Sequence, residues 1–429
     1  MPDGIKFSEL QSTLTLGNND LAAVSHDNGD STYTSVKVPM TQLGQKVVND
    51  IDYTQALNTT SKKPIGAINE LKNELMNIYP VLATSPAPIA NFSTDLALPL
   101  KSCKVEIKPK QASGTPTPSN PLPISGTDTI TIYQTGANLW DEDLESGSIN
   151  TSTGQNETYG TDRMRSANYI PVQPSTAYYF VSKNNVSCYA YCYRKDKSYI
   201  GIYGGGSNIR NATITTPSDC YFIRFRTDNN YGTTYANDFS LNYPSTDTTY
   251  HAHVTATTKN VSLPSSVYGG EVDVIGGSGK SEKALIDFGD QTLTWAKSPS
   301  VPNCFFSSVI SGANATGTQE VLSSIYAYSS APTGSMPNET IKMYQGRLYV
   351  IDDDYATADA FVTGVSGQKV LYPLATPTPI TLANPIELTA QSGVNNVFGD
   401  TDGNTSVEFR ESVQKYVDDN IAAVQALIL

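Results

Sequence analysis

Residues Tyr169 to Arg226 decide how this chain can fold. They contain four runs with turn residues between them: Tyr169-Ile-Pro-Val-Gln-Pro-Ser-Thr-Ala-Tyr-Tyr-Phe180, Cys188-Tyr-Ala-Tyr-Cys-Tyr-Arg194, Tyr199-Ile-Gly-Ile-Tyr203 and Tyr221-Phe-Ile-Arg-Phe-Arg226. Short aromatic and β-branched runs separated by Pro, Gly, Asn and Asp are typical of strands joined by tight turns. The stretch therefore predicts a β-sandwich.

The tyrosines of this stretch are candidates for a recognition surface. Tyr189, Tyr191 and Tyr193 alternate, and alternate residues of a strand project from the same face. A tyrosine ring presents a flat apolar face with a polar tip, which suits contact with a sugar. The candidate ligand-binding residues are Tyr189, Tyr191, Tyr193, Tyr199, Tyr203 and Arg194, with Arg224 and Arg226 nearby as further donors. Packing of the same rings inside the sandwich is the alternative interpretation.

Length and composition narrow the class of protein. With 429 residues the chain is longer than one hydrophobic core usually serves, so several domains are expected. Only 16% of the residues are charged, which is typical of short strands and many turns. The formal net charge of −13 argues against a nucleic-acid partner, because phosphate neutralisation needs clustered Lys and Arg. The sequence shows neither a membrane span nor a signal peptide, so we expect synthesis in a cytoplasm.

The chain order predicts a mainly β protein in six segments. We expect a small N-terminal unit at 1–60, a short coiled-coil helix and linker at 61–85, and a β connector at 86–135. The jelly-roll β-sandwich follows at 136–250, then a further antiparallel β domain at 251–410 and a C-terminal helix at 411–429. The Asn28-Gly29 pair predicts a β-hairpin within the first segment.

The predicted N-terminal helix carries a possible oligomer seam. Ile68, Leu71, Leu75 and Ile78 alternate steps of three and four, as in a coiled coil. The alternative is an ordinary amphipathic helix packed on its own domain, because two heptads are too short to be stable alone.

A Pro-rich segment occurs twice. Thr115-Pro-Thr-Pro-Ser-Asn-Pro-Leu-Pro-Ile-Ser-Gly126 returns in degraded form as Thr376-Pro-Thr-Pro-Ile-Thr-Leu-Ala-Asn-Pro-Ile-Glu-Leu388. The two copies bracket the predicted sandwich and the domain after it. We therefore expect the strands beside them to form one interrupted domain.

The cysteines and histidines do not predict a cofactor site. Cys188 and Cys192 would lie roughly 13 Å apart along a strand, too far for a disulfide, so buried free thiols are expected. A zinc site from Cys188, Cys192, Cys220 and a histidine is the alternative, although the Cys-x-x-Cys spacing is missing. His251 and His253 share one face of an extended segment.

Three further motifs are interpreted as turns. Gly276-Gly-Ser-Gly-Lys-Ser281 lacks the first Gly of a phosphate-binding loop and predicts a hairpin loop. Asp400-Thr-Asp-Gly403 echoes a calcium loop, but its Gly comes too early. The carboxylates of Asp141, Asp219 and Asp352–354 are interpreted as turn formers, with glycoside cleavage as the alternative. No catalytic residue, metal or cofactor is expected.

Four segments resemble a known module. Gly136-Ala-Asn-Leu-Trp-Asp-Glu-Asp143, Ser166-Ala-Asn-Tyr-Ile-Pro-Val-Gln-Pro-Ser-Thr-Ala-Tyr-Tyr179, Tyr191-Cys-Tyr-Arg-Lys-Asp-Lys-Ser-Tyr-Ile-Gly201 and Thr215-Thr-Pro-Ser-Asp-Cys-Tyr-Phe-Ile-Arg-Phe225 resemble a carbohydrate-binding-module-like jelly roll. Such modules recur in tail, baseplate and fibre proteins of bacteriophages. The resemblance implies a virion appendage, commonly a homotrimer, in which a pair such as His251 and His253 resembles the His-x-His metal sites of fibre shafts.

The expected function follows from this resemblance together with the tyrosines. We expect a non-enzymatic virion fibre or baseplate protein, made in the host bacterial cytoplasm, that attaches to other virion proteins through residues 1–60. Its sandwich would adsorb to host-surface or mucosal glycan. A purely architectural spacer or a head decoration fibre is the alternative, and a depolymerase is the third class.

Overall fold

The computed structural model describes residues 21–27, 33–39, 81–158 and 162–410. The chain divides into two units, Met1–Ile78 and Tyr79–Leu429. In the first unit β1 (Leu21–Asp27) pairs antiparallel with β2 (Tyr33–Pro39), which confirms the hairpin predicted from Asn28-Gly29. The predicted helical seam and the C-terminal helix lie outside the described residues.

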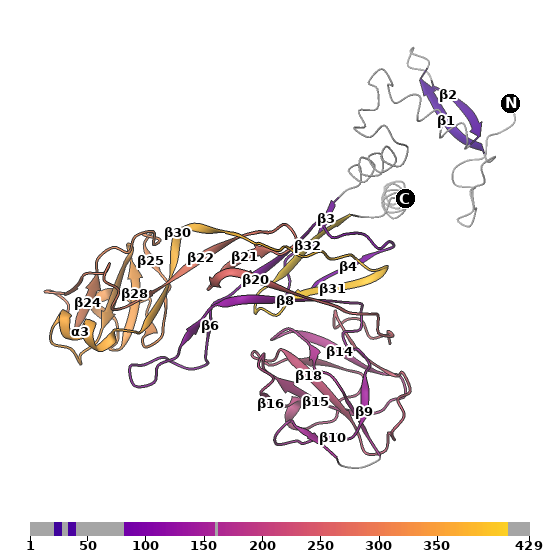
Figure 1. The fold of residues 1–429 in the computed structure, drawn as a ribbon, viewed down its shortest axis with the longest axis horizontal. Coiled ribbons are helices and arrows are strands. Elements are labelled where there is room, and N and C mark those ends of the chain that lie inside the picture. The colour runs from indigo at the N-terminus through magenta and orange to yellow at the C-terminus, as the bar shows by residue number, and fades with distance from the viewer. Residues whose placement is uncertain (1–20, 28–32, 40–80, 159–161, 411–429) are drawn as a thin grey trace. The chain divides into compact units, whose positions relative to one another are not determined.

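The second unit is mainly β, as predicted, and is built on two packed antiparallel sheets that we call the base sandwich (Figure 1). The first sheet has the order β20 (Thr257–Val267), β8 (Thr127–Thr135), β31 (Gly393–Gly399), β4 (Ala90–Thr94). The second has the order β26 (Leu322–Ser323), β30 (Lys369–Thr381), β22 (Ser278–Asp287), β21 (Gly270–Asp273), β5 (Ser102–Ile107), β32 (Thr405–Arg410), β3 (Val81–Ala83). Between β5 and β8 the chain forms a short antiparallel pair, β6 (Lys110–Gln111) and β7 (Ile124–Ser125).

Alternating apolar residues hold the base sandwich together. In β5 the inward positions are Cys103, Val105 and Ile107, all at most 2% exposed, and in β8 they include Ile130 and Ile132. These side chains belong to one buried cluster that also contains residues of β4, β20, β21, β31 and β32. Because apolar residues recur at every second position of these strands, one face of each sheet lies in a shared core.

A second sandwich is inserted between β8 and β20, and we call it the inserted sandwich. Its larger sheet has the order β16 (Tyr199–Ile202), β15 (Cys188–Tyr193), β18 (Phe222–Thr227), β12 (Met164–Ser166), β9 (Leu144–Ser146), with β13 (Ile170–Pro171) also on β18. Its smaller sheet has the order β17 (Ala212–Thr215), β14 (Ala177–Ser182), β19 (Phe239–Asn242). A short hairpin, β10 (Ser148–Ile149) and β11 (Asn156–Glu157), and the 3-10 turn η2 (Tyr203–Gly205) complete it.

The core of the inserted sandwich is aromatic. Trp140 is fully buried and stacks on Phe225 and Phe239, with ring centroids 4.7 and 5.6 Å apart. Phe180 of the smaller sheet stacks on Phe225 of the larger at 5.1 Å. The two sheets therefore pack face to face, as the β-sandwich prediction required.

A third β-rich part is inserted between β22 and β30. Its sheet has the order β23 (Trp295–Lys297), β24 (Cys304–Ser307), β29 (Arg347–Ile351), β28 (Thr340–Tyr344), β25 (Thr318–Gln319), with β27 (Ala327–Tyr328) parallel to β28. The turn η3 (Thr333–Ser335) and the helix α3 (Ala358–Val365) also belong to it. The helix was not predicted, although Thr357 caps it and Phe361 and Val365 bury one face.

The interrupted domain predicted from the Pro-rich repeat is confirmed. β8 pairs with β31 and β5 pairs with β32, so residues near 130 and near 400 share sheets. The predicted domain at 251–410 contains strands of two sheets. Its first and last strands and β26 belong to the base sandwich, whereas β23, β24, β25, β27, β28 and β29 form a separate sheet. Both insertions begin and end on paired strands, Gln134 opposite Thr257 and Asp287 opposite Lys369.

Candidate functional site

The outer face of β15 carries the predicted tyrosines. Cys188, Ala190 and Cys192 point into the aromatic core of the inserted sandwich. Tyr189, Tyr191 and Tyr193 lie on the opposite face, as their alternation predicted, in a separate small cluster with Ile149. The strand thus serves two cores, one on each face.

The neighbouring strand β18 adds arginines to the same face. Its register places Arg226 opposite Tyr189 and Arg224 opposite Tyr191. Arg226 also lies opposite Arg165 of β12, and Arg165 lies opposite Glu145 of β9. One row across four strands therefore reads Tyr189, Arg226, Arg165, Glu145. We call this row and the residues around it the arginine–tyrosine face.

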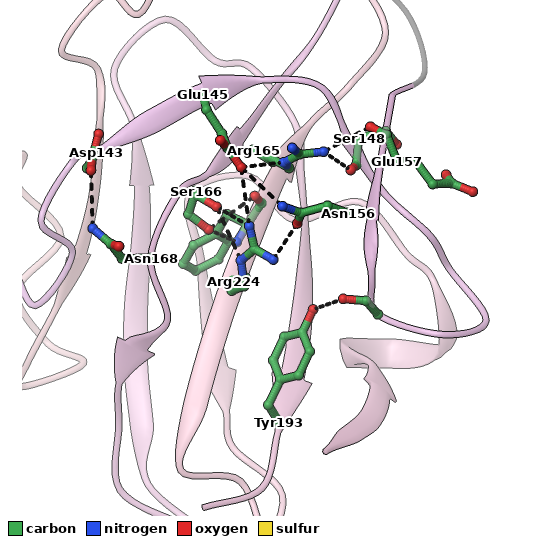
Figure 2. Close-up of polar contacts among 12 residues, drawn as sticks. Asp143, Glu145, Ser148, Asn156, Glu157, Arg165, Ser166, Asn168, Tyr193 and Arg224 are labelled. Carbon is green, nitrogen blue, oxygen red and sulfur yellow. Dashed lines mark hydrogen bonds and ion pairs between the residues drawn. The ribbon is translucent and has the colours of Figure 1, made fainter. Parts of the chain in front are cut away.

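The hairpin formed by β10 and β11 covers part of this face. The hydroxyls of three tyrosines donate to its backbone: Tyr191 to the Ile149 carbonyl at 3.0 Å, Tyr193 to the Gly154 carbonyl at 2.7 Å and Tyr199 to the Thr151 carbonyl at 2.9 Å. Figure 2 shows the Tyr193 hydroxyl directed at its acceptor. Tyr191 and Tyr193 are consequently 0% exposed.

Glycine at position 154 permits the close approach of the hairpin. Its φ of +68° lies in the left-handed region, which favours glycine. A Cβ there would lie 2.5 Å from Cδ2 of Tyr199 and 3.0 Å from Cε1 of Tyr193. No larger residue fits between the loop and these rings without displacing one of them.

The three arginines of the face have unequal partners, and Figure 2 shows those of Arg165 and Arg224. Arg165 donates from Nε to Glu145 at 2.7 Å and from Nη1 to the carbonyls of Ser148 and Glu157 at 2.7 and 2.8 Å. Arg224 donates to the Ser166 carbonyl at 2.6 Å and to Oδ1 of Asn156 at 2.7 Å. Its Nη2 lies 3.9 Å from the Glu145 carboxylate.

Arg226 is the arginine with the fewest contacts. It is 8% exposed, and its single hydrogen bond within the described part of the chain runs from Nη1 to Oγ of Ser148 at 3.4 Å. Its Nε is buried and has no partner there. The guanidinium carbon lies 4.2 Å from the ring centroid of Tyr189, a cation–π distance.

Burial of the tyrosines changes their acidity. Loss of solvent raises the pKa of Tyr191 to about 12 and raises the pKa of Tyr193 further above its usual value. The nearby Arg226 and Arg224 oppose these two shifts of pKa, respectively. Both hydroxyls therefore remain neutral donors at physiological pH.

We expect the free energy of unfolding to fall as the pH rises above about 10. An unfolded tyrosine ionises near pH 10, whereas folded Tyr191 keeps its proton up to a pKa of about 12. The folded state therefore binds more protons in this window, so this contribution is complete below about pH 10 and is lost as the pH rises. Urea unfolding followed by circular dichroism at about pH 8 and about pH 11 measures the loss. Tyr191→Phe should lose less between the two pH values, and an equal loss in both proteins would contradict the assignment.

The predicted binding residues are not all brought together. Tyr199 joins Tyr189, Tyr191 and Tyr193 on the arginine–tyrosine face. Tyr203 packs on the other side, against the aromatic core, and its hydroxyl accepts from the Thr215 amide at 3.3 Å. Arg194 is exposed in the turn after β15, where its Nε pairs with Asp219 at 2.8 Å.

The expectation that the tyrosines form an open surface is wrong for Tyr191 and Tyr193, which are buried. Tyr191 and Tyr193 have no exposed area and both hydroxyls are satisfied, so these rings offer no surface to a ligand in this structure. Tyr189 and Tyr199 are half-buried and keep some surface. The first pair is buried, as the alternative interpretation expected, but under the β10–β11 hairpin and not inside the sandwich.

Sequence reasoning missed Glu145, Arg165 and Asn156. The available signal was the placing of arginines at alternate positions. Arg163 and Arg165 flank Met164 in this way, as Arg224 and Arg226 do within β18. Nothing in one sequence shows that these two runs share a sheet, because 57 or more residues separate them.

The remaining motifs have structural roles. The hairpin predicted at Gly276–Ser281 is present, but its turn lies earlier, at residues 274–277, and Ser278–Ser281 belong to β22. Asp273 accepts from the amides of Ile275 and Gly276 at 3.1 and 2.8 Å. Asp400 accepts from the Thr131 amide at 2.8 Å and pairs with Lys195 at 2.8 Å. Asp273 therefore orders its own turn, whereas Asp400 connects the residue after β31 with β8 and Lys195.

The acidic run at Asp352–Asp354 brings three carboxylates within 4.8 Å of one another. Two of them accept side-chain donors: Asp352 from Tyr326 at 2.6 Å and Asp353 from Asn338 at 2.5 Å. Asp352 also accepts from the Asp354 amide at 3.0 Å, the contact of a turn former, in line with the interpretation of the sequence.

All five cysteines are free and buried, as predicted. Among the described residues, no cysteines or histidines gather into a group with metal-ligand spacing. His251 pairs with Asp247 at 2.7 Å, and the His253 amide donates to Glu142 at 2.7 Å.

Comparison of the chain with protein-family models, curated proteins and solved structures finds no match. Within the described ranges, no helix has both the length and the apolar character needed to cross a membrane.

Proposed function

We propose that the protein is a non-enzymatic structural component of a bacteriophage virion, a fibre or baseplate protein whose inserted sandwich binds carbohydrate on host cells or in mucus. The resemblance of residues 136–225 to carbohydrate-binding-like jelly rolls supports this assignment. Homotrimeric assembly through Ile68–Ile78 and attachment to other virion proteins through residues 1–60 belong to the same proposal, as does location in the virion.

The observation that carries the proposal is the arginine–tyrosine face. Tyr189, Tyr199 and Tyr169 are half-buried, so part of each ring remains available at the edge of the covered region. Aromatic faces pack on the apolar side of a sugar ring, and guanidinium groups donate to its hydroxyls. The arginines and tyrosines of this face supply both interactions on one sheet.

The way the sandwich is attached also supports a display role. The chain leaves β8 at Thr135 and re-enters β20 at Thr257, and these two strands are paired. An insertion whose ends are adjacent can carry a folded module without disturbing the sheet that supports it. Recognition modules are commonly held by rigid scaffolds in this manner.

A glycan array probed with the full-length protein tests the proposal. We expect binding that Tyr189→Ala abolishes and that Tyr179→Ala leaves intact. Tyr179 is a suitable control because it is also half-buried but lies on β14 of the other sheet. Absence of binding to any glycan by the unmodified protein would remove the adsorption role, and equal losses in both variants would remove this face as the site.

A purely architectural role is the second candidate, and the burial of Tyr191 and Tyr193 favours it. Both side chains complete a small core under the β10–β11 hairpin, which is what a spacer domain requires. In that case the inserted sandwich would contact only neighbouring virion proteins, and the same array would show no binding.

A further inference from the structure

The arginine–tyrosine face contains more positive than negative charge. Three guanidinium groups, those of Arg165, Arg224 and Arg226, lie on adjacent positions of β12 and β18. Within ion-pair distance they share one carboxylate among the described residues, that of Glu145, at 2.7 Å from Arg165 and 3.9 Å from Arg224. Local excess positive charge is unexpected in a chain of net charge −13.

The other carboxylates nearby make contacts of their own and form no ion pair with Arg226. Asp162, which Arg226 influences electrostatically, pairs with Arg163 at 2.9 Å. Glu157 accepts from Nδ2 of Asn150 at 2.5 Å. Residues 159–161 are Tyr, Gly and Thr, and so they carry no carboxylate. No described carboxylate lies within ion-pair distance of Arg226.

The position of Arg226 makes its isolation costly. Arg165 and Arg226 are directly opposed on neighbouring strands, where side chains of like charge repel. Arg226 is also 8% exposed, so water screens its charge poorly, and its buried Nε makes no hydrogen bond with a described residue. A buried charge without a partner normally disfavours the folded state.

An anionic ligand would remove this cost. Because Nε itself is buried, an oxyanion beside Arg226 would accept from the Nη groups, in the charge-assisted hydrogen bonds that a guanidinium makes to carboxylate, sulfate and phosphate. The ring of Tyr189, which stacks on Arg226 at 4.2 Å, lies half-exposed at the same place. A ring-bearing ligand with one acidic group fits this combination.

We propose that Arg226 is the anion-binding residue of a site for acidic saccharides on the inserted sandwich, with Tyr189 contacting the sugar. This inference rests on the proposed carbohydrate-binding function and adds the class of sugar. The ligand is a saccharide that carries an oxyanion group, and a neutral saccharide of the same length binds more weakly.

The test uses the full-length protein and titration calorimetry with three probes: oligogalacturonate for carboxylate, a sulfated dextran oligosaccharide for sulfate, and a maltooligosaccharide as the neutral control. We expect at least one acidic probe to bind about tenfold or more tightly than the neutral one. Its affinity should fall as salt is added, because salt screens the charge. The two acidic probes show which oxyanion the site prefers.

Arg226→Met separates a binding role from a structural one. If the arginine is retained for a ligand, the variant should lose about tenfold or more in affinity for the acidic probe, while its urea midpoint stays equal or rises. Arg194→Met is the matched control, because Arg194 is exposed on the same module and already paired with Asp219. It should change neither quantity.

Three results would overturn the inference. Equal binding of acidic and neutral probes would refute the anion site while leaving carbohydrate binding in place. Unchanged affinity in Arg226→Met would refute the role of this residue. No binding of any saccharide, there and on the glycan array, would remove the proposed function together with the inference.

Discussion

Replacing Gly270 with alanine is expected to destabilise the base sandwich by about 3 kcal/mol or more. Gly270 begins β21 with a φ of +141°, in the region that favours glycine. A Cβ at this position would lie 2.0 Å from the carbonyl oxygen of Lys280 in β22, the strand it pairs with. The backbone of a paired strand cannot move aside without breaking hydrogen bonds between the strands. Backbone strain and lost hydrogen bonds therefore both contribute to the loss of stability.

Gly269 supplies the matched control for this prediction. An alanine Cβ there would approach only the Lys283 side chain, at 3.2 Å from its Cδ, and a flexible side chain can move. We expect Gly269→Ala to cost under about 1 kcal/mol. Hydrogen exchange localises the effect, because Gly270→Ala should accelerate exchange in β21 and β22 and leave the inserted sandwich unchanged. Equal urea midpoints and exchange rates in the two variants would contradict the close contact with Lys280.

Much of the fold was predictable because it depends on local pattern. The alternation in Tyr189 to Tyr193 predicts two different faces of β15, and the structure has a separate core on each. The two Pro-rich segments predict that the chain returns to an earlier sheet, and β8 and β31 pair accordingly. Both predictions use information contained in short stretches.

The cover over the tyrosines could not be predicted, because it depends on contacts between distant residues. Residues 148–157 show neither helical nor strand periodicity, and their position is fixed by hydrogen bonds from tyrosines about 40 residues later in the chain. Without this hairpin Tyr191 and Tyr193 would be exposed. The candidate site therefore shifts from the tyrosines to the residues beside them.

The burial of the arginines was difficult to predict for a related reason. Composition places charged side chains at the surface, yet Arg165, Arg224 and Arg226 are all at most 9% exposed. Arg224 and Arg226 were recognised as donors near the tyrosines, while Arg165 comes from a strand whose pairing with β18 is not visible in sequence. Burial of a charge depends on its partners, and these are non-local.

Replacing Arg165 with alanine is expected to cost about 1–3 kcal/mol and to release the β10–β11 hairpin. Arg165 is 9% exposed, and its guanidinium donates to Glu145, to the Ser148 carbonyl and to the Glu157 carbonyl. Its removal leaves both hairpin carbonyls without that donor, and buried acceptors without donors are costly. The hairpin covers Tyr191 and Tyr193, so their rings should become accessible to solvent when it detaches.

The measurement combines urea unfolding with hydrogen exchange of residues 145–158, and Arg194→Ala is its control. Arg194 forms an exposed ion pair with Asp219 at 2.8 Å, and pairs of this kind contribute about 0–1 kcal/mol. A loss confined to Arg165→Ala, with faster exchange in the hairpin, would show that one buried arginine holds the cover in place. A loss of similar size in Arg194→Ala, or unchanged exchange in Arg165→Ala, would mean that the tyrosine hydroxyls hold the hairpin by themselves. The contacts of the two arginines predict opposite effects on the free energy of unfolding: Arg165 is expected to stabilise the fold, and Arg226 to destabilise it. That second result would mean that Arg165 does not stabilise the hairpin as its contacts indicate.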